Sequence, residues 1–286
     1  MSRPSPFLAF SPLLLLLLTA CGDEDHTAQS RKKILEDHGP RVAEIVIDDL
    51  KRHQQGLRIA ADRMKAGWVK VEGEEQEHGM RKALQLMRSP KKGVRELVIS
   101  PMSFMAAVDK NGIAIARDTE PDHMKGMDLA KLFPTVKAAL AGNDGYEVGE
   151  FPSMKEGGDP SVTIMMATPV HWKDEVVGAL VLGIPLWRLQ QRLSKQLQME
   201  GAGKESKGVV LWVYVYRGDE LHKHGTPRDL DQLVPDAAAR KAGLAGSPGG
   251  FTGQLVQFGF WYAYGVRPIR VLGDGMGVVI FRMDPQ

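Results

Sequence analysis

The chain has 286 residues, of which 37 are Lys or Arg and 35 are Asp or Glu, so its net charge is close to zero. Without a block of Lys and Arg it has no electrostatic footprint for nucleic acid, and that class of partner is not expected. Its one cysteine, Cys21, excludes disulfides and a thiolate metal site from the rest of the chain, which must therefore be held together by its hydrophobic core.

The first residues form the most informative segment. Arg3 is followed by an apolar stretch, Phe7 to Leu18, and then by the small residues Thr19 and Ala20. A basic start, an apolar centre and small residues before a cleavage point are typical of a secretory signal peptide. The apolar stretch is too short to span a bilayer comfortably, so a resident transmembrane helix is the weaker interpretation.

Leu18-Thr19-Ala20-Cys21 also resembles the lipobox of bacterial lipoproteins. The resemblance implies cleavage before Cys21, a lipid on its sulfur and an acyl chain such as palmitate on its new amine. It places the protein in the cell envelope, facing the periplasm or the exterior. Two or more acyl chains would hold it stably on a membrane. The alternative is an ordinary secretory signal that happens to precede a cysteine.

Residues 1–20 are therefore expected to form a signal peptide, residues 21–30 a polar tether, and residues 31–90 a helical segment. After Pro40, apolar residues recur in steps of three or four from Val42 to Trp68. This spacing predicts a long amphipathic helix.

The pattern changes beyond this long helix. Lys70 to Gly79 predicts a glutamate-rich turn, and Met80 to Met87 a second helix that Ser89-Pro90 ends. Phe104 to Val108 and Ile113 to Ala116 alternate with a period of two, and the Asn-Gly pair between them is a strong hairpin signal.

The next predicted elements complete a module. A helix is expected over 128–142, with an aspartate as its N-terminal cap and a glycine at its end. Val162 to Val170 and Val176 to Ile184 predict a second pair of strands, and Leu186 to Met199 returns to helix. No segment in this region is apolar enough and long enough to cross a membrane.

The sequence after a polar, glycine-rich linker at 201–207 repeats the sequence before it. Asp128-Leu129 and Pro134 return as Asp229-Leu230 and Pro235, and Pro169 and Gly178 return as Pro268 and Gly277. Strands are expected at Val209 to Tyr216, Trp261 to Val266 and Met276 to Phe281. The sequence thus predicts an α+β fold with two β-β-α-β-β modules, at 91–200 and 208–286. Chance similarity of turn sequences is the alternative.

A long helix followed by two such modules resembles the double Cache domain, a PAS-like extracytoplasmic sensor. The resemblance is carried by turn and packing residues, namely Ala107-Val108-Asp109-Lys110-Asn111-Gly112, Ala116-Arg117-Asp118, Gly126-Met127-Asp128-Leu129, Thr168-Pro169-Val170 and Val177-Gly178-Ala179-Leu180. It implies a long helix on one face of a curved antiparallel sheet and a ligand-binding concavity on the other.

Two departures from the family pattern bear on function. Typical members continue into a transmembrane helix and a cytoplasmic output module, which we do not find before Gln286. A separate membrane protein partner is therefore expected to receive the signal. The tyrosine–arginine–tryptophan constellation of amino-acid-binding members cannot be placed in this sequence, so an amino acid ligand is not favoured.

Candidate ligand-binding residues are those near the expected concavity of the first module that do not fit a simple core or surface role. They are Arg117, Asp118, His123, Tyr146, Thr163, Met165 and His171. An arginine among hydrogen-bonding groups suits a carboxylate or a similar anion. The alternative roles are an ion pair with Asp118 or a surface acid for Arg117, and core filling for Met165.

Other chemistry is weakly indicated. His222 and His224 would share one face of a strand, but no third ligand is fixed by spacing, so surface histidines are the preferred interpretation and no metal or cofactor is expected. No nucleophile elbow, His-Glu-x-x-His motif or phosphate-binding loop is present. The aromatic run 258–264 is interpreted as core packing, with a partner surface as the alternative.

The leading hypothesis is a membrane-anchored extracytoplasmic sensor that binds a small molecule in its first module and relays to a separate partner. The second hypothesis is a ligand-free interaction protein of the cell envelope on the same scaffold. It predicts a first-module cavity filled by side chains and an exposed apolar patch. An enzyme is the third and is not expected, because it would need titratable groups converging on a cleft.

Overall fold

The structure is a computed structural model that describes residues 27–70, 72–153, 157–201, 208–257 and 259–284. The expected signal peptide, Cys21 and most of the predicted linker lie outside the described residues. The helices are α1 (Ala28–Lys33), α2 (Gly39–Met64), α3 (Gly73–Met87), α4 (Arg95–Val98), α5 (Leu129–Leu132), α6 (Pro134–Leu140), α7 (Leu186–Gly201), α8 (Arg228–Asp231) and α9 (Ala237–Gly246). The strands are β1 (Phe104–Asp109), β2 (Ala114–Arg117), β3 (Gly145–Phe151), β4 (Ser161–Trp172), β5 (Glu175–Pro185), β6 (Val210–Arg217), β7 (Glu220–His222), β8 (Phe251–Gln257), β9 (Phe260–Pro268) and β10 (Met276–Met283).

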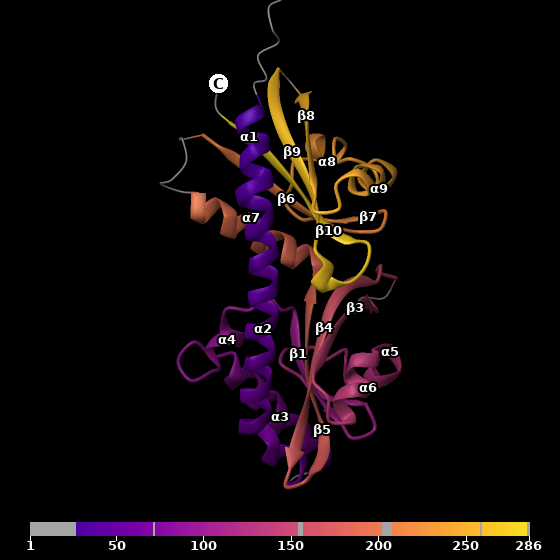
Figure 1. Cartoon of the computed structure of the whole chain (residues 1–286). Helices are drawn as coiled ribbons and strands as arrows, with labels where there is room; N and C mark the ends of the chain where they lie inside the picture. Colours follow the sequence, from indigo (N-terminus) through magenta and orange to yellow (C-terminus); the bar gives the residue numbers. More distant parts are fainter. Residues whose placement is uncertain (1–26, 71, 154–156, 202–207, 258, 285–286) are drawn as a thin grey trace, which may run out of the picture.

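One helical rod runs along both halves of the molecule (Figure 1). It consists of α1, a π-helical turn (Ile34–His38), α2 and a 3₁₀ turn (Lys65–Trp68). Proline lacks an N–H and its ring collides with the carbonyl four residues back. The wider π-helical turn directly before Pro40 accommodates that ring, so the proline does not start the helix as its position in the sequence suggests.

The helix therefore begins earlier than predicted and shortens the expected tether of residues 21–30. Thr27 and Ser30 are buried, and each donates a side-chain hydrogen bond to the far end of the sequence, to Gln254 and Asp284 respectively. These tertiary contacts order a segment that has no apolar periodicity of its own.

The structure also corrects the prediction for the glutamate-rich stretch. A turn is predicted from Lys70 to Gly79, but α3 already begins at Gly73. Glu74 and Glu75 occupy its first turn, where negative charge is stabilised by the positive end of the helix dipole. The predicted end of this helix agrees with the structure, because α3 stops at Met87.

The two sheets have the same topology, β2-β1-β5-β4-β3 and β7-β6-β10-β9-β8, with every neighbouring pair antiparallel. The predicted α+β fold, a long helix followed by two antiparallel modules, is confirmed. The sequence pattern did not predict the strands β3, β7 and β8. These are outer strands with few buried side chains, and pairing with a neighbouring strand defines them better than their apolar pattern does.

The helix predicted over 128–142 is divided into α5 and α6. Asp128 caps it as expected, its side chain accepting a hydrogen bond from the backbone of Lys131 at 2.9 Å. Pro134 then forces the preceding Phe133 into an extended conformation, which ends α5 and starts α6. Gly142 closes α6 with a φ of 91°, a conformation that favours glycine.

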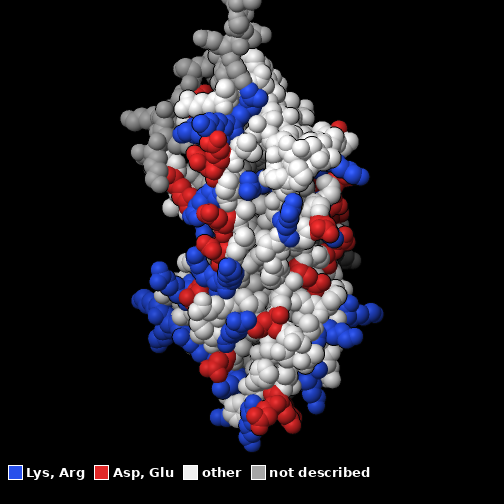
Figure 2. Space-filling view, viewed as in Figure 1, with Lys and Arg blue, Asp and Glu red and all other residues white. Residues whose placement is uncertain are grey.

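The hydrophobic core follows the long helix. A single cluster of buried residues joins α2, α3 and α7 to the inner faces of both sheets, from Met105 and Leu182 in the first to Val278 and Ile280 in the second. Each sheet carries a separate cluster on its outer face. On the face shown in Figure 2, acidic and basic side chains are interspersed along the long helix, while the surface over β8 and β9 is mostly uncharged.

Candidate functional site

The outer face of the first sheet, where a ligand cavity is expected, is filled by side chains. Helices α5 and α6 cover it, and three phenylalanines pack between them and the sheet. The ring of Phe151 lies 4.9 Å from that of Phe104 and 5.9 Å from that of Phe133, and all three are buried. The larger cavities formed by the described residues are not lined by this cluster. The expected small-molecule concavity is therefore occupied by the protein itself.

Two of the predicted site residues belong to this packed interior. Met165 is fully buried within the outer cluster of the first sheet, which agrees with its alternative role as core filling. Thr163 is 1% exposed, and its hydroxyl donates to the carbonyl of Ser161 at 3.0 Å. Neither side chain lines any of the larger cavities formed by the described residues.

Three more predicted residues lie around the end of β2 and do not converge on a cavity. Asp118 is buried, forms an ion pair with Arg88 and accepts a hydrogen bond from the backbone of Met105 at 3.2 Å. Asp118 thus pairs with Arg88 at the end of α3 and not with Arg117, the pairing that was one alternative to a ligand-binding role. Arg117 is half-buried, and its Nε has no hydrogen-bond partner among the described residues. His123 is exposed.

The loop after β2 is organised by Asp122, a residue that the sequence reasoning missed. Its carboxylate accepts backbone hydrogen bonds from Arg117 at 2.8 Å and Met124 at 3.0 Å, and an ion pair from Arg81 at 3.2 Å. Arg81 also binds Glu77 at 2.7 Å on α3. The sequence did indicate this role of Asp122, because an aspartate that hydrogen-bonds the backbone two residues ahead is common in turns. This cluster holds the loop to α3.

Tyr146 and His171, the remaining predicted residues, do line cavities. A groove of about 670 Å³ lies between α2, the start of β3 and the 3₁₀ turn of the second module (Arg270–Leu272). A second cavity of about 290 Å³ adjoins it and shares Arg58 and Asp144 with it. The two cavities are lined by Ile47, Leu50, Lys51, Gln54, Gln55, Arg58, Ala61, Asp62, Gly142, Asp144, Gly145, Tyr146, Thr168, Pro169, His171 and Val271. We call them together the junction groove.

Asp144 is the centre of the polar network in the junction groove. Its carboxylate binds the guanidinium of Arg58 at 2.7 Å and the amide nitrogen of Gln54 at 3.3 Å, and accepts a hydrogen bond from the hydroxyl of Thr168. The amide nitrogen of Gln54 also donates to the carbonyl of Ala167 at 3.1 Å. Helix α2 is in this way fixed to the first sheet by two side chains one turn apart.

Gln54 brings an unused acceptor to the groove. Its amide oxygen is buried and has no hydrogen-bond partner among the described residues. A buried acceptor without a donor costs about 1–3 kcal/mol, so an O–H or N–H group that reached it would be stabilised. Lys51 lines the same groove, one turn before Gln55 on α2, and supplies a positive charge to it. Lys51 has no hydrogen bond or ion pair to any described residue. The groove can therefore receive both a donor and an anion.

Tyr146 joins the two modules across the groove. Its hydroxyl donates a hydrogen bond to the carbonyl of Val271 at 3.0 Å. Partial burial raises the pKa of Tyr146 above its ordinary value, so the phenol keeps its proton and remains a donor. Ile47, Leu50 and Val271 add apolar surface around this contact. The groove thus combines polar and apolar walls, as small-molecule sites do.

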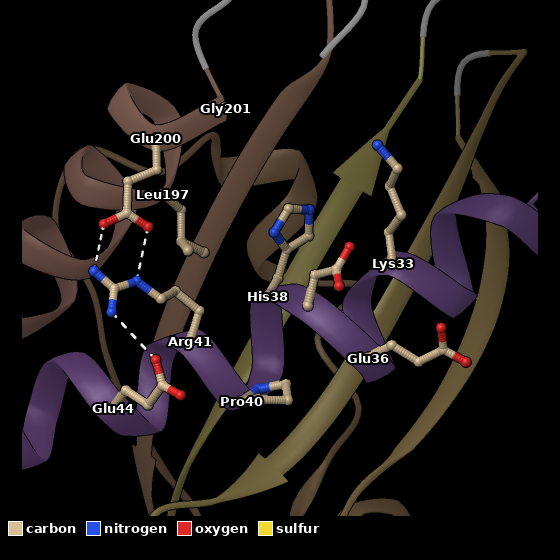
Figure 3. A pocket seen from close by; sticks show the side chains of 10 residues that line it. Lys33, Glu36, His38, Pro40, Arg41, Glu44, Leu197, Glu200 and Gly201 are labelled. Atoms are coloured by element: carbon tan, nitrogen blue, oxygen red, sulfur yellow. Dashed lines mark hydrogen bonds and ion pairs between the residues drawn. The ribbon is translucent and has the colours of Figure 1, made fainter. Parts of the chain in front are cut away.

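A further cavity, of about 450 Å³, is lined by the π-helical turn, the start of α2 and the end of α7 (Figure 3). Three of its charged groups bind one another. The guanidinium of Arg41 binds both carboxylate oxygens of Glu200, at 2.7 and 2.8 Å, and a carboxylate oxygen of Glu44 at 3.2 Å. A bidentate contact of this kind ties α2 to α7. We interpret this cavity as a structural junction between helices.

Both histidines, His222 and His224, were predicted to lie at the surface, but only His224 is exposed; the side chain of His222 is 15% exposed, and burial lowers its pKa below the ordinary value. His222 Nε2 lies 3.8 Å from a carboxylate oxygen of Glu220, and the ring of His224 lies 5.1 Å from that of Trp187. Across the described ranges, no three His, Cys, Asp or Glu side chains are grouped so that they could hold a metal ion. Cys21, the predicted lipidation site, is outside those ranges.

The sequence reasoning missed Gln54, Arg58, Asp144 and Thr168. The spacing of four residues between Gln54 and Arg58 places both on one face of α2, but a polar pair on an amphipathic helix ordinarily faces solvent. Asp144 follows the glycine that closes α6 and precedes a strand that was not predicted. Only the packing of α2 on β4 brings the four side chains together.

No family model matches the chain, and no curated protein matches it by sequence. Solved structures do match. The sensor domain of the Vibrio cholerae histidine kinase DctB is 14% identical, with a TM-score of 0.53 over 90% of this chain and 99% of that domain. The ligand-binding domain of the Campylobacter jejuni chemoreceptor Tlp3 is 11–12% identical. Its complex with 4-methylisoleucine gives a TM-score of 0.57 over 91% of this chain and 93% of that domain, and its complex with L-norvaline 0.55 over 92% and 96%. The chain therefore has the Cache-type fold of these sensor domains.

Proposed function

We propose that the protein is a membrane-anchored extracytoplasmic sensor that binds a small molecule in the junction groove and passes the bound state to a separate membrane partner. The observation that carries the proposal is the position of the groove. It is bounded by both modules and by α2, and one hydrogen bond, from Tyr146 to Val271, crosses it. A ligand there would contact both halves of the molecule at once.

The envelope location is supported by the fold and the sequence together. The matching structures are sensor and ligand-binding domains of a histidine kinase and a chemoreceptor. The lipobox-like Leu18-Thr19-Ala20-Cys21 would attach this chain to a membrane through lipid on Cys21. Within the described ranges, the structure contains no helix that is both long and apolar enough to span a bilayer. From the lipobox-like motif we infer that lipid on Cys21 holds the protein at the membrane, and we propose that a second protein carries the signal onward.

The residues of the groove favour a ligand with a carboxylate, a hydrogen-bond donor and an apolar part. Lys51 would bind the carboxylate, the amide oxygen of Gln54 would accept from the donor, and Ile47 and Val271 would contact the apolar part. The volume of the groove is within the range of small-molecule sites. The Tlp3 domain has been crystallised with L-valine and L-norvaline, which are ligands of this general chemistry.

We infer binding without catalysis. Two acids line the groove, and both are paired: Asp144 binds Arg58 and is hydrogen-bonded by Gln54 and Thr168, and Asp62 binds Lys65 at 2.7 Å. Each is therefore poorly placed to act as a general base. The relay would instead use movement. A ligand that inserts beside Tyr146 would displace or tighten its contact with Val271 and so change the angle between the modules.

The second candidate, a ligand-free interaction protein, is favoured by one observation. The concavity of the first module is filled by Phe104, Phe133 and Phe151 and their neighbours. If the junction groove also takes no ligand, the scaffold would serve assembly at the envelope. The two candidates differ in whether any small molecule stabilises the protein.

The test is a thermal-shift screen of the purified protein against aliphatic monocarboxylates, dicarboxylates and amino acids. A bound compound at about 100 times its Kd stabilises the fold by about 2.7 kcal/mol, so Tm should rise by several degrees. Arg58→Ala and Gln54→Leu should each weaken the affinity at least about tenfold, since they disrupt the groove's polar network. Arg63→Ala, an exposed position on the same helix, is the matched control and should bind as wild type does. A screen without any shift would contradict the sensor and support the interaction protein.

A further inference from the structure

The β8–β9 hairpin has an unusual composition for a surface element. From Phe251 to Val266 the sequence contains no Asp, Glu, Lys or Arg. Near the tip, Val256 is 49% exposed and Phe260 is 45% exposed. The register pairs Val256 with Trp261 and Gln257 with Phe260, so Val256 and Phe260 lie on opposite faces of the hairpin. Apolar side chains on both faces of a tip have no common surface of the protein to pack against.

The hairpin tip lies at the end of the molecule where the described chain begins. The hydroxyl of Thr27 donates to the amide oxygen of Gln254 on β8 at 2.5 Å, so the first turn of α1 is attached to the hairpin three residues before the last residue of β8. In Figure 1, β8 and β9 extend past the first turn of α1, in the direction from which the chain enters. Among the described residues, the tip of the hairpin therefore projects furthest along α1 at this end.

Few residues separate this end from the predicted lipid. Only residues 22–26 lie between Cys21 and Thr27, and an extended chain of that length spans about 20 Å at most. A lipid on Cys21 would consequently hold the end that carries the hairpin against the membrane surface. Arg31, Lys32 and Lys33 in the last turn of α1 would then stand near anionic headgroups, to which basic residues are attracted.

We propose that the tip of the β8–β9 hairpin, through Val256 and Phe260, inserts into the interfacial region of a phospholipid bilayer and forms a second contact beside the lipid anchor. The inference rests on the proposed anchoring at Cys21. Aromatic and aliphatic side chains partition favourably into the interface between headgroups and acyl chains. With two contacts, the long axis of the protein has a fixed direction relative to the membrane, so the junction groove and the first module are held away from it.

The experiment uses the full lipidated chain in vesicles of phosphatidylcholine and phosphatidylglycerol. Since Cys21 is the only cysteine, and its sulfur would be lipidated, Gln257→Cys provides one free thiol for an environment-sensitive fluorophore. Asp174→Cys, in the exposed turn between β4 and β5 at the opposite end of the molecule, is the matched control. The label at 257 should shift to the blue and be quenched by brominated lipid, and the label at 174 should do neither.

Loss of the apolar pair should abolish the signal. In the Gln257→Cys background, Val256→Ser with Phe260→Ser should reduce the spectral shift to that of the control, while both positions are exposed enough for the fold to persist. An anchored protein whose label at 257 is unaffected by vesicles would overturn the proposal. A blue shift without vesicles that grows with protein concentration would also overturn it, in favour of a second copy of the chain as the occupant.

A second arm separates this proposal from the anchoring. A Cys21→Ser chain with a histidine tag before residue 21 is attached to nickel-chelating lipid in the same vesicles, and the label at 257 is measured again. If the native chain fails to sediment with vesicles but the tagged chain shows the shift, the lipid anchor is wrong and the hairpin contact stands. If the tagged chain shows no shift either, the hairpin contact is wrong.

Discussion

His53 is a strongly perturbed titratable group of the long helix, and the structure gives a clear cause. It is 2% exposed on the buried face of α2, and burial lowers its pKa to about 4 from an ordinary value of 6.5. Asp49 opposes this effect, while Arg52 and Arg192 add to it. The imidazole is therefore neutral in the folded protein over most of the acidic range.

This burial makes stability depend on pH in a defined direction. Below about pH 6.5 the unfolded chain protonates His53, whereas the folded chain does not until about pH 4, so the stabilisation by neutral His53 is lost as the pH falls through this window. The full loss is about 3 kcal/mol at 1.36 kcal/mol per pKa unit.

Urea unfolding of wild type and His53→Gln at pH 7 and pH 4 tests this. Wild type should lose about 2–3 kcal/mol more than the variant between these values, because glutamine does not titrate. His78→Gln, at an exposed position on α3, is the control and should lose as much as wild type. Equal losses in wild type and His53→Gln would show that the imidazole is not responsible.

At the scale of residues, the candidate site was only partly predictable. Tyr146 and His171 do line the junction groove, as predicted for ligand-binding residues. The sequence offered no means to choose Arg88 as the partner of Asp118, because 30 residues separate them and pairing of Asp118 with Arg117 was equally compatible. Met165 was assigned both roles and the fold decided for the core. Partners distant in sequence are set by tertiary packing, which residue types alone do not specify.

At the scale of elements, the repeated glycines Gly178 and Gly277 have the same structural reason. Each lies near the start of the central strand of its sheet, β5 or β10. A Cβ on Gly178 would collide with the indole nitrogen of Trp68 and the carbonyl of Val108, and one on Gly277 would collide with the hydroxyl of Tyr216 and a strand carbonyl. A large aromatic side chain lies over the glycine in both modules, but Trp68 covers the inner face of the first sheet and Tyr216 the outer face of the second.

We expect Gly178→Ala to destabilise the protein by about 1–3 kcal/mol, because Trp68, which also donates to the carbonyl of Val108 at 2.9 Å, would have to move. Gly79→Ala is the matched control. A Cβ at this position in α3 meets nothing within 4 Å, and alanine should stabilise the helix by about 0.5–1 kcal/mol. Chemical denaturation measures both. A neutral Gly178→Ala would mean that Trp68 is not held against β5.

Elements with a strong apolar period were the predictable ones. The strands β4 and β5 and the helix α7 were expected within a few residues of their bounds, because their buried faces are continuous. The edge strand β3 was not, since its two glycines and two glutamates give no such period and only pairing with β4 defines it. The division of α5 from α6 was signalled by Pro134 in the sequence and should have been inferred.

At the scale of the whole molecule, the two modules share one core. The cluster around α2 contains Leu182 and Met105 of the first sheet and Val278 and Ile280 of the second without interruption. Two domains built on separate cores could unfold one after the other, but here the loss of either sheet exposes the face of α2 that the other needs.

Scanning calorimetry should therefore show one transition for the purified protein. Gly277→Ala, which disturbs only the second sheet directly, should lower the Tm of that single transition by about 2–4 °C for each kcal/mol lost. The calorimetric and van't Hoff enthalpies should agree in both proteins. Two resolved peaks, with only one of them shifted by the substitution, would mean that the modules unfold independently.

The duplicated topology could be predicted from the sequence, because matched spacing indicates a repeated chain path even where side chains differ. What spacing could not show is that the outer faces diverge in content. The first is sealed by three phenylalanines, while the second is rich in tyrosine, with Tyr214 and Tyr216 buried beside Phe281. Such differences depend on how helices of different length pack on the outer face of each sheet.

The pairing of the first helix with the last strand also sets the order in which the chain can fold. The side chain of Ser30 binds Asp284, and His38 accepts a hydrogen bond at 2.9 Å from the buried Arg282. Because β10 lies in the middle of the second sheet, that sheet is incomplete until Met283 has been made. Synthesis starts at the N-terminus, so all strands of the first module are available about a hundred residues before all strands of the second module. The second module, which lies beside the N-terminal helix α1, is therefore the last to be completed.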